Sequence, residues 1–274
     1  MDTPPGIRPR RVTDTEYRTL RLELRGRVLV VTIDHPDNKY NLVDTTLMEE
    51  MAGLMSALRN QTEARAVVLT GSGKCFSAGG SFELMQQLDR PEFGAYIARQ
   101  SRQLINDLLD VPVPIVCAMN GPAIGFGATW VLLSDIAFAG SDVTLSDPHV
   151  LRGIGTPDGA ALWNLVMSPQ RAKRFLMTGE ELSATQAEEL GLITFVTEPG
   201  AALEKALAYA EQLAGYAPSA VAHTKLTCNI HIREALDRSF DLGAAWECED
   251  FRSNDHKEAV AAFREKRAPD FTGT

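Results

Sequence analysis

The sequence predicts an α/β protein in which strands and helices alternate before a helical C-terminal region. Apolar runs rich in β-branched residues at 27–36 and 64–73 flank the segment 45–61, whose apolar residues recur at helical spacing. A strand, a helix and a second strand in this order predict a parallel β-α-β unit. After residue 198 the composition becomes rich in alanine and other helix-forming residues, which predicts three or more helices.

Further elements continue the alternation toward the middle of the chain. The segment 113–121 is predicted to be a third buried strand, and the amphipathic segment 93–110 before it a helix. One or two short strands are expected within 135–146. The N-terminal segment has basic residues but no apolar run behind them, so it does not resemble a signal peptide. We therefore expect three parts: a flexible arm over 1–16, an α/β core over 17–198 and a helical region over 199–274.

The bulk composition excludes several classes of protein. The 274 residues are 45% hydrophobic and carry a net charge of −9, with the basic residues scattered, which argues against a nucleic-acid binder. No apolar run is long enough to cross a membrane. The four cysteines lie far apart and the histidines lack metal-ligand spacing, so we expect a cytoplasmic protein with neither a disulfide framework nor a metal.

Three glycine-rich segments, 71–84, 120–130 and 149–160, follow predicted strands. None contains the complete spacing of a dinucleotide-binding turn or a P-loop. Glycine-rich turns that open into helices leave backbone N–H groups unpaired, and two such turns can stabilise a carbonyl oxygen as it becomes negative. The alternative is that these glycines only permit tight packing or a positive φ angle.

Five segments in order along the chain resemble the crotonase superfamily, the enoyl-CoA hydratase/isomerase group: "KCFSAGGSF" (74–82), "NGPAIGFGATWVLLSDIAFAG" (120–140), "LSDPHVLRGIGTPDGA" (145–160), "FLMTGEELSATQAEELGLITFV" (175–196) and "SNDHKEAVAAFREKRAPDFTG" (253–273). The resemblance implies a spiral of ββα units with a helical trimerisation region, in a homotrimer or a dimer of trimers. It implies no cofactor beyond CoA as part of a substrate. It also implies an oxyanion hole formed by the backbone N–H groups of Ala78 and Phe126.

Three positions depart from the family pattern in the segments that carry the resemblance. Hydratases of the family carry two glutamates, and the matching positions here are Thr129 and His149. The addition of water to an enoyl thioester is understood to use both carboxylates. Ser81 also replaces the acidic residue that is common after the Ala-Gly-Gly turn. The sequence therefore argues against an ordinary hydratase.

The stretch "DPHVLRGIGTPDGA" (147–160) is similar to that of the 6-oxocamphor hydrolases, members that cleave carbon–carbon bonds of cyclic β-diketones without CoA. That resemblance implies a catalytic dyad of His149 and Asp158, with Glu247 as a further catalytic residue. A neutral imidazole can take a proton from water while a carboxylate fixes its tautomer. In the alternative interpretation His149 is a loop histidine with a structural role, and Glu247 is an exposed helical residue.

CoA binding is a separate question. Lys39 lies where the family binds the nucleotide, and Lys266 with Arg267 resembles residues that hold CoA phosphates. Basic residues at the end of a helix can instead only complement its dipole. Three functions follow: retro-Claisen hydrolysis of a 1,3-dicarbonyl, which we favour; a CoA-thioester hydratase, isomerase or thioesterase with unusual catalytic residues; or a non-catalytic binding protein with the same fold.

Overall fold

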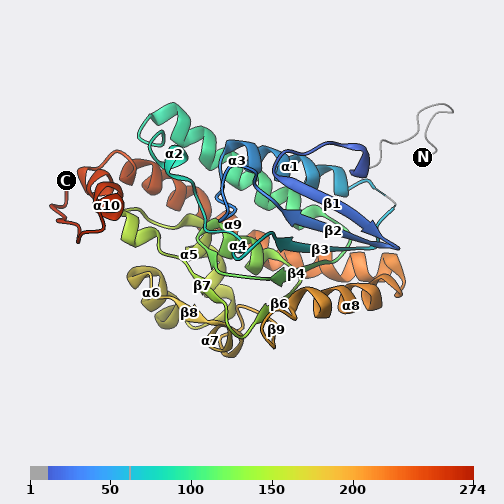
Figure 1. Ribbon diagram of the computed structural model, residues 1–274. Helices are drawn as coiled ribbons and strands as arrows, with labels where there is room; N and C mark the ends of the chain where they lie inside the picture. The colour runs from blue at the N-terminus through green and yellow to red at the C-terminus, as the bar shows by residue number, and fades with distance from the viewer. Residues whose placement is uncertain (1–11, 62) are drawn as a thin grey trace.

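The central sheet of the computed structural model, which describes residues 12–61 and 63–274, has six strands (Figure 1). β1 pairs antiparallel with β2, and the following strands are all parallel to their neighbours. Every residue of β2 is buried, as expected for a parallel strand covered on both faces. In spatial order the strands are β1 (Leu20–Arg25), β2 (Val28–Ile33), β3 (Ala66–Gly71), β4 (Ile115–Met119), β6 (Ile136–Gly140) and β9 (Phe195–Thr197).

A second, smaller sheet supports the site described below. It consists of β5 (Ala123–Ile124), β7 (Thr144–Ser146) and β8 (Leu182–Ser183), with β7 in the middle. β5 is parallel to β7, so both strands run in the same direction and end at the same edge. The residues that follow them, Gly125 and Asp147, therefore lie close to one another.

Helices cover both faces of the large sheet. α1 (Thr45–Leu58) and α3 (Pro91–Asp110) pack on one face, whereas α8 (Ala202–Ala214) packs on the other (Figure 1). Four buried alanines at intervals of four residues allow α8 to approach the strands closely. The other helices are α2 (Phe82–Met85), α4 (Phe126–Leu133), α5 (Pro157–Val166), α6 (Pro169–Thr178), α7 (Ala184–Glu189), α9 (Pro218–Asp250) and α10 (Asn254–Glu265), with 3-10 turns η1 (Val12–Asp14) and η2 (His149–Arg152).

The architecture confirms the predicted fold class, including the parallel pair β2–β3 around α1 and the helical C-terminal region. Residues 1–11 of the predicted arm lie outside the described residues, whereas Val12 is buried in the core. The C-terminal region shares that core, because Leu236 and Phe240 of α9 pack in it. Within residues 12–61 and 63–274, no helix has the length and apolar character needed to span a bilayer.

A buried lysine attaches the C-terminal region to the central sheet. Lys225 on α9 donates a hydrogen bond to the Val113 carbonyl at 3.0 Å, and its Nζ lies 2.7 Å from Oδ2 of Asp135. The same carboxylate accepts a 2.7 Å hydrogen bond from the Ile115 backbone N–H at the start of β4. Burial lowers the pKa of Lys225, against the opposing effect of Asp135. Lys225 therefore fixes α9 to the segments that directly precede β4 and β6.

Replacing Lys225 by methionine should lower the free energy of unfolding by about 3 kcal/mol, because Asp135 loses its buried counter-charge. Urea unfolding followed by circular dichroism measures the change. Lys205→Met is the matched control: Lys205 is exposed and lies 3.8 Å from Glu204, which is also exposed, so a change below about 0.5 kcal/mol is expected. Equal unfolding midpoints for Lys225→Met and the wild type would contradict the proposed attachment.

Candidate active site

One cavity of about 400 Å³ brings together residues from the core and from the C-terminal helices. This volume is in the range of small-molecule sites. Most of its wall is apolar, including Met48, Leu84, Met85, Leu88, Ile97 and Phe240. Three titratable residues named from the sequence, His149, Asp158 and Glu247, also line it. The structure therefore places all three candidate catalytic side chains around one apolar cavity.

His149 is positioned by the turn that follows β7. It begins η2, which ends at Gly153 with a left-handed φ of +67°. The N–H of Gly125, at the end of β5, donates a 2.9 Å hydrogen bond to the Ser146 carbonyl at the end of β7. A Cβ atom on Gly125 would lie only 3.5 Å from Cε1 of His149. The imidazole therefore lies beside the turn that starts α4.

The carboxylate bonded to the His149 ring is Asp147. Its Oδ1 is hydrogen-bonded to Nδ1 of His149, and its Oδ2 accepts a 2.8 Å hydrogen bond from the Thr156 hydroxyl. Only 2% of Asp147 is exposed. A Cβ atom on Gly159 would overlap Oδ2 of Asp147, so this position requires glycine. Asp147 is thus held at both oxygens and fixes the orientation of the ring.

This pairing corrects the expectation that Asp158 would be the partner of His149. Asp158 lies in the first turn of α5 and accepts a hydrogen bond from the Thr129 hydroxyl on α4. Its other oxygen lies 3.5 Å from the Thr156 hydroxyl. The residue missed from the sequence is the aspartate two positions before His149. The available signal was the short spacing: Asp147 and His149 are separated only by Pro148, whose φ of −92° and ψ of 28° accompany the contact between the two side chains.

Glu247 approaches the other nitrogen of the ring. It projects from α9, and its Oε1 lies 4.0 Å from Nε2 of His149. That separation is longer than a hydrogen bond. A water or a substrate oxygen beside this gap can contact both groups at once. The predicted proximity of Glu247 to the site is therefore observed, and the two groups converge on one position.

Burial and charge set the protonation of the cluster. Burial favours neutral His149, but the charge and hydrogen bond of Asp147 outweigh it and raise the pKa of His149 to about 10. Burial would also raise the pKa of Asp147, yet the imidazolium keeps it below its ordinary value. Burial raises the pKa of Glu247 to about 8, and it raises the pKa of Asp158. At neutral pH the cluster therefore holds the ion pair of His149 with Asp147 beside Glu247, most of which is protonated.

The backbone N–H of Phe126, one of the two predicted oxyanion donors, is free to bind a ligand. Phe126 is the first residue of α4, directly after Gly125, and its N–H has no acceptor among the described residues. The N-terminal N–H groups of a helix lack intrahelical acceptors and carry the positive end of its dipole. Gly125 adopts a φ of +55°, which turns the chain from β5 into the helix. This donor lies next to the His149 ring.

The second predicted donor, Ala78, is corrected by the structure. Its N–H donates a 3.0 Å hydrogen bond to the Tyr40 carbonyl and is not free. The N–H of Gly80 has no acceptor in the described part of the chain, and Gly80 lines the cavity. Gly79 makes the turn between them at a φ of +76°, and a Cβ there would lie 2.8 Å from the Ile124 carbonyl oxygen. Gly80 and Phe126 are therefore the candidate pair of donors.

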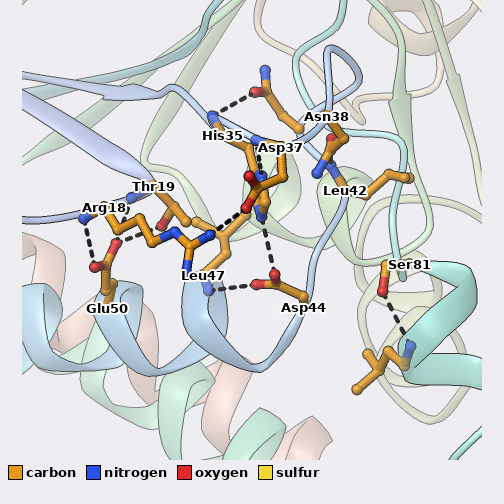
Figure 2. Close-up of polar contacts among 12 residues, drawn as sticks. Arg18, Thr19, His35, Asp37, Asn38, Leu42, Asp44, Leu47, Glu50 and Ser81 are labelled. Carbon is orange, nitrogen blue, oxygen red and sulfur yellow. Dashed lines mark hydrogen bonds and ion pairs between the residues drawn. The ribbon is translucent and has the colours of Figure 1, made fainter.

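Lys39 lies in an open groove of about 630 Å³ that adjoins the cavity, because Tyr40 lines both. Its Nζ is 5.3 Å from the centre of the Tyr40 ring. Figure 2 shows how this loop is held: Nε2 of His35 lies 3.0 Å from Oδ2 of Asp44, whose other oxygen caps α1 at Leu47. The loop that borders the groove is therefore held by hydrogen bonds to the start of α1, and Lys39 is the lysine that lines the groove.

The two basic residues after α10 are placed differently. Arg267 forms ion pairs with Glu258 and, at 2.6 Å, with Glu265. Lys266 is the C-cap of α10 in a left-handed conformation, at a φ of +53°. Two carboxylates of α10 thus already balance the charge of Arg267. A phosphate would have to compete with these two carboxylates.

Comparison with known proteins identifies the family. The sequence model of the family described as "Enoyl-CoA hydratase/isomerase" matches residues 23–274. The chain belongs to this crotonase family. A short-chain-enoyl-CoA hydratase of Clostridium acetobutylicum is 32% identical over 260 residues, which cover 92% of this chain and 97% of the hydratase. The sequence resemblance and the mixed α/β architecture therefore agree.

Two solved structures show how far the likeness of this crotonase-family enzyme extends. An enoyl-CoA hydratase/isomerase from Mycobacterium paratuberculosis superposes with a TM-score of 0.84 at 33% identity, covering 89% of this chain and 98% of the other. A β-diketone hydrolase from the cyanobacterium Anabaena superposes with a TM-score of 0.80 at 25% identity, covering 86% and 95%. The fold is thus shared with an enoyl-CoA hydratase/isomerase and with a β-diketone hydrolase.

The pairing of His149 with Asp147 can be tested without a substrate. The ring resonances of His149, assigned with a His149→Gln variant, should titrate near pH 10 in the wild-type protein. Asp147→Asn should lower this pKa by about 2 units or more, because the main charge stabilising the imidazolium is removed. Asp158→Asn should lower it less. A larger shift in Asp158→Asn than in Asp147→Asn would contradict the assignment.

Proposed function

We propose that this crotonase-superfamily enzyme hydrolyses a carbon–carbon bond of a 1,3-dicarbonyl compound, a retro-Claisen reaction. The observation that carries the proposal is the convergence of the His149–Asp147 pair and Glu247 beside the free N–H groups of Gly80 and Phe126. The similar structure from Anabaena, a β-diketone hydrolase bound to (S)-3-oxocyclohexyl acetic acid, supports this chemistry.

The first step is the activation of water between His149 and Glu247. When Glu247 has lost its proton, one proton remains for two sites, Nε2 of His149 and the carboxylate of Glu247. The two sites lie 4.0 Å apart, with the water between them. In either distribution one of them is a base facing the water and the other is an acid. Hydroxide then adds to one ketone carbon, and the resulting alkoxide accepts hydrogen bonds from Gly80 and Phe126. Asp147 stabilises the imidazolium throughout this step.

The second step breaks the bond between that carbon and the carbon between the two carbonyls. The electron pair of the bond moves to the second ketone as an enolate, and the tetrahedral carbon becomes a carboxylic acid. The member of the His149–Glu247 pair that took the proton from water returns it to the enolate carbon. Asp158 also lines the cavity, where it accepts a hydrogen bond from the Thr129 hydroxyl, and burial raises its pKa. The products are a ketone and a carboxylate within one ring-opened molecule, or two fragments from an acyclic substrate.

A CoA thioester is the second candidate substrate. Two observations favour it: relatives such as the Clostridium enzyme are enoyl-CoA hydratases, and the groove of Lys39 adjoins the cavity through Tyr40. The ion pairs of Arg267 weigh against it. The third alternative is a non-catalytic binding protein. It requires that loss of His149 change no activity.

We also propose that the chain assembles as a homotrimer or a dimer of trimers in the cytoplasm. Large apolar side chains are exposed on helices of this protomer, including Trp246 and Leu242 on α9 and Met177 on α6. Contact with further protomers would remove such surface from water. Light scattering of the purified protein measures the number of protomers.

The substrate class is tested with a panel that contains 2,2-dimethylcyclohexane-1,3-dione, crotonyl-CoA and a β-ketoacyl-CoA. We expect turnover of the diketone, with a carboxylate product, and a decrease of about 10²-fold or more in His149→Ala, because the proton-transferring ring is lost. His223→Ala removes an exposed histidine of α9 and serves as the control. Turnover of only the CoA thioesters would contradict the proposal.

The pH dependence tests the role of Glu247. For the wild type, kcat/KM of the diketone should rise as Glu247 loses its proton, with a midpoint near pH 8. The plateau should extend toward pH 10, where His149 in turn loses its proton. Glu247→Gln should lower the plateau and remove the transition near pH 8. A wild-type rate that falls as the pH rises through 8 would show that the protonated form of Glu247 is required instead.

A further inference from the structure

Arg152 is a cation in the cavity that the proposed mechanism does not use. It lines the same apolar cavity as His149 and is half-buried. Its hydrogen bond is made to the backbone carbonyl of Leu151, at 3.3 Å. Among residues 12–61 and 63–274, no carboxylate lies within ion-pair distance of its guanidinium. A buried charge without a counter-ion is unfavourable, so this arrangement is suited to an incoming anion.

The geometry of η2 explains why Arg152 faces the cavity. In a 3-10 helix residues i and i+3 project from the same side, and Arg152 is three residues after His149. The Phe263 ring of α10 lies under the guanidinium, at 3.8 Å from the ring centre. Nδ1 of His256 donates a 2.7 Å hydrogen bond to the Arg152 carbonyl. α10 thus holds both the backbone and the side chain of Arg152 in place.

The charges around the cavity leave Arg152 unbalanced. Asp147 and His149 form one neutral ion pair. Burial raises the pKa of Glu247 to about 8 and also raises the pKa of Asp158. Neither carboxyl group forms an ion pair with Arg152 within the described residues, and burial lowers the pKa of the guanidinium. A ligand with a negative charge would supply the counter-ion that Arg152 lacks in the cavity wall.

We propose that Arg152 binds a carboxylate group of the substrate, at a distance from the reacting carbonyls, so that the enzyme selects anionic 1,3-dicarbonyl compounds. A planar guanidinium can hold a carboxylate through two parallel hydrogen bonds. The statement about 1,3-dicarbonyls rests on the proposed function, whereas the statement about the carboxylate rests on the surroundings of Arg152. A carboxylate is favoured over a nucleotide phosphate because Arg152 shares the wall of a cavity of about 400 Å³ with His149.

The test uses two unreactive probes, 3-oxocyclohexane-1-carboxylate and cyclohexanone, whose binding is measured by calorimetry. Because each has a single ketone, neither can undergo the carbon–carbon cleavage. The wild type should bind the keto acid at least about tenfold more tightly, as expected for a hydrogen bond between charged groups. Arg152→Gln should lose this preference. Arg152→Lys should retain part of it, because lysine keeps the charge without the fork.

Matched variants and a second ligand separate the outcomes. Arg171→Gln removes an exposed arginine of α6 and should leave the preference unchanged. No preference in the wild type, or a preference that survives in Arg152→Gln, would overturn the proposal. So would a loss of CoA binding in Arg152→Gln with keto-acid binding unchanged, since the ligand would then be a phosphate. Hydrolysis of the neutral 2,2-dimethylcyclohexane-1,3-dione is measured separately, so that failure of the reaction and failure of carboxylate binding can be distinguished.

Discussion

The buried ion pair between Asp147 and His149 is the interaction on which the arrangement of the site depends. An isolated charge in an apolar cavity is unstable, and here each charge stabilises the other. Thr156 links this pair to the fold, because its hydroxyl donates to Asp147 and also accepts the Gly159 N–H at the start of α5. The orientation of the imidazole and the position of α5 are therefore set by the same three side chains and one glycine.

The oxyanion donors depend on a different network, centred on Asn41. Its side-chain amide donates to the backbone carbonyls of Cys75 and Phe76, at 2.9 and 3.2 Å, and the backbone carbonyl of Asn41 accepts a 2.8 Å hydrogen bond from the Ser77 hydroxyl. Asn41 adopts a φ of +50° to do so. The loop is thereby fixed in a register that uses the N–H of Ala78 and leaves that of Gly80 free.

These networks explain which features of the fold and the site the sequence could predict. Apolar periodicity predicted β2, α1 and β3, because burial on a strand or helix repeats with the period of the element. The glycine-rich turn over 78–80 could be located, but which of its N–H groups is free depends on pairing with a loop some forty residues earlier. In the same way, spacing alone could not decide between Asp147 and Asp158, since the direction of each side chain is set by tertiary contacts. Arg152 was missed because an arginine in a loop usually lies in solvent; its i+3 relation to His149 was the available signal.

The replacement of a family glutamate by His149 changes the charge balance of the whole cavity. A carboxylate at this position would add a negative charge near Glu247, whereas a protonated imidazole adds a positive one and requires Asp147 to balance it. With that pair neutral, burial raises the pKa of Glu247 to about 8 and also raises the pKa of Asp158. Arg152 is then a cation of the cavity wall that has no carboxylate partner within the described residues. His149 thus serves the chemistry proposed at one end of the ligand, and Arg152 is expected to bind a negative charge at the other end.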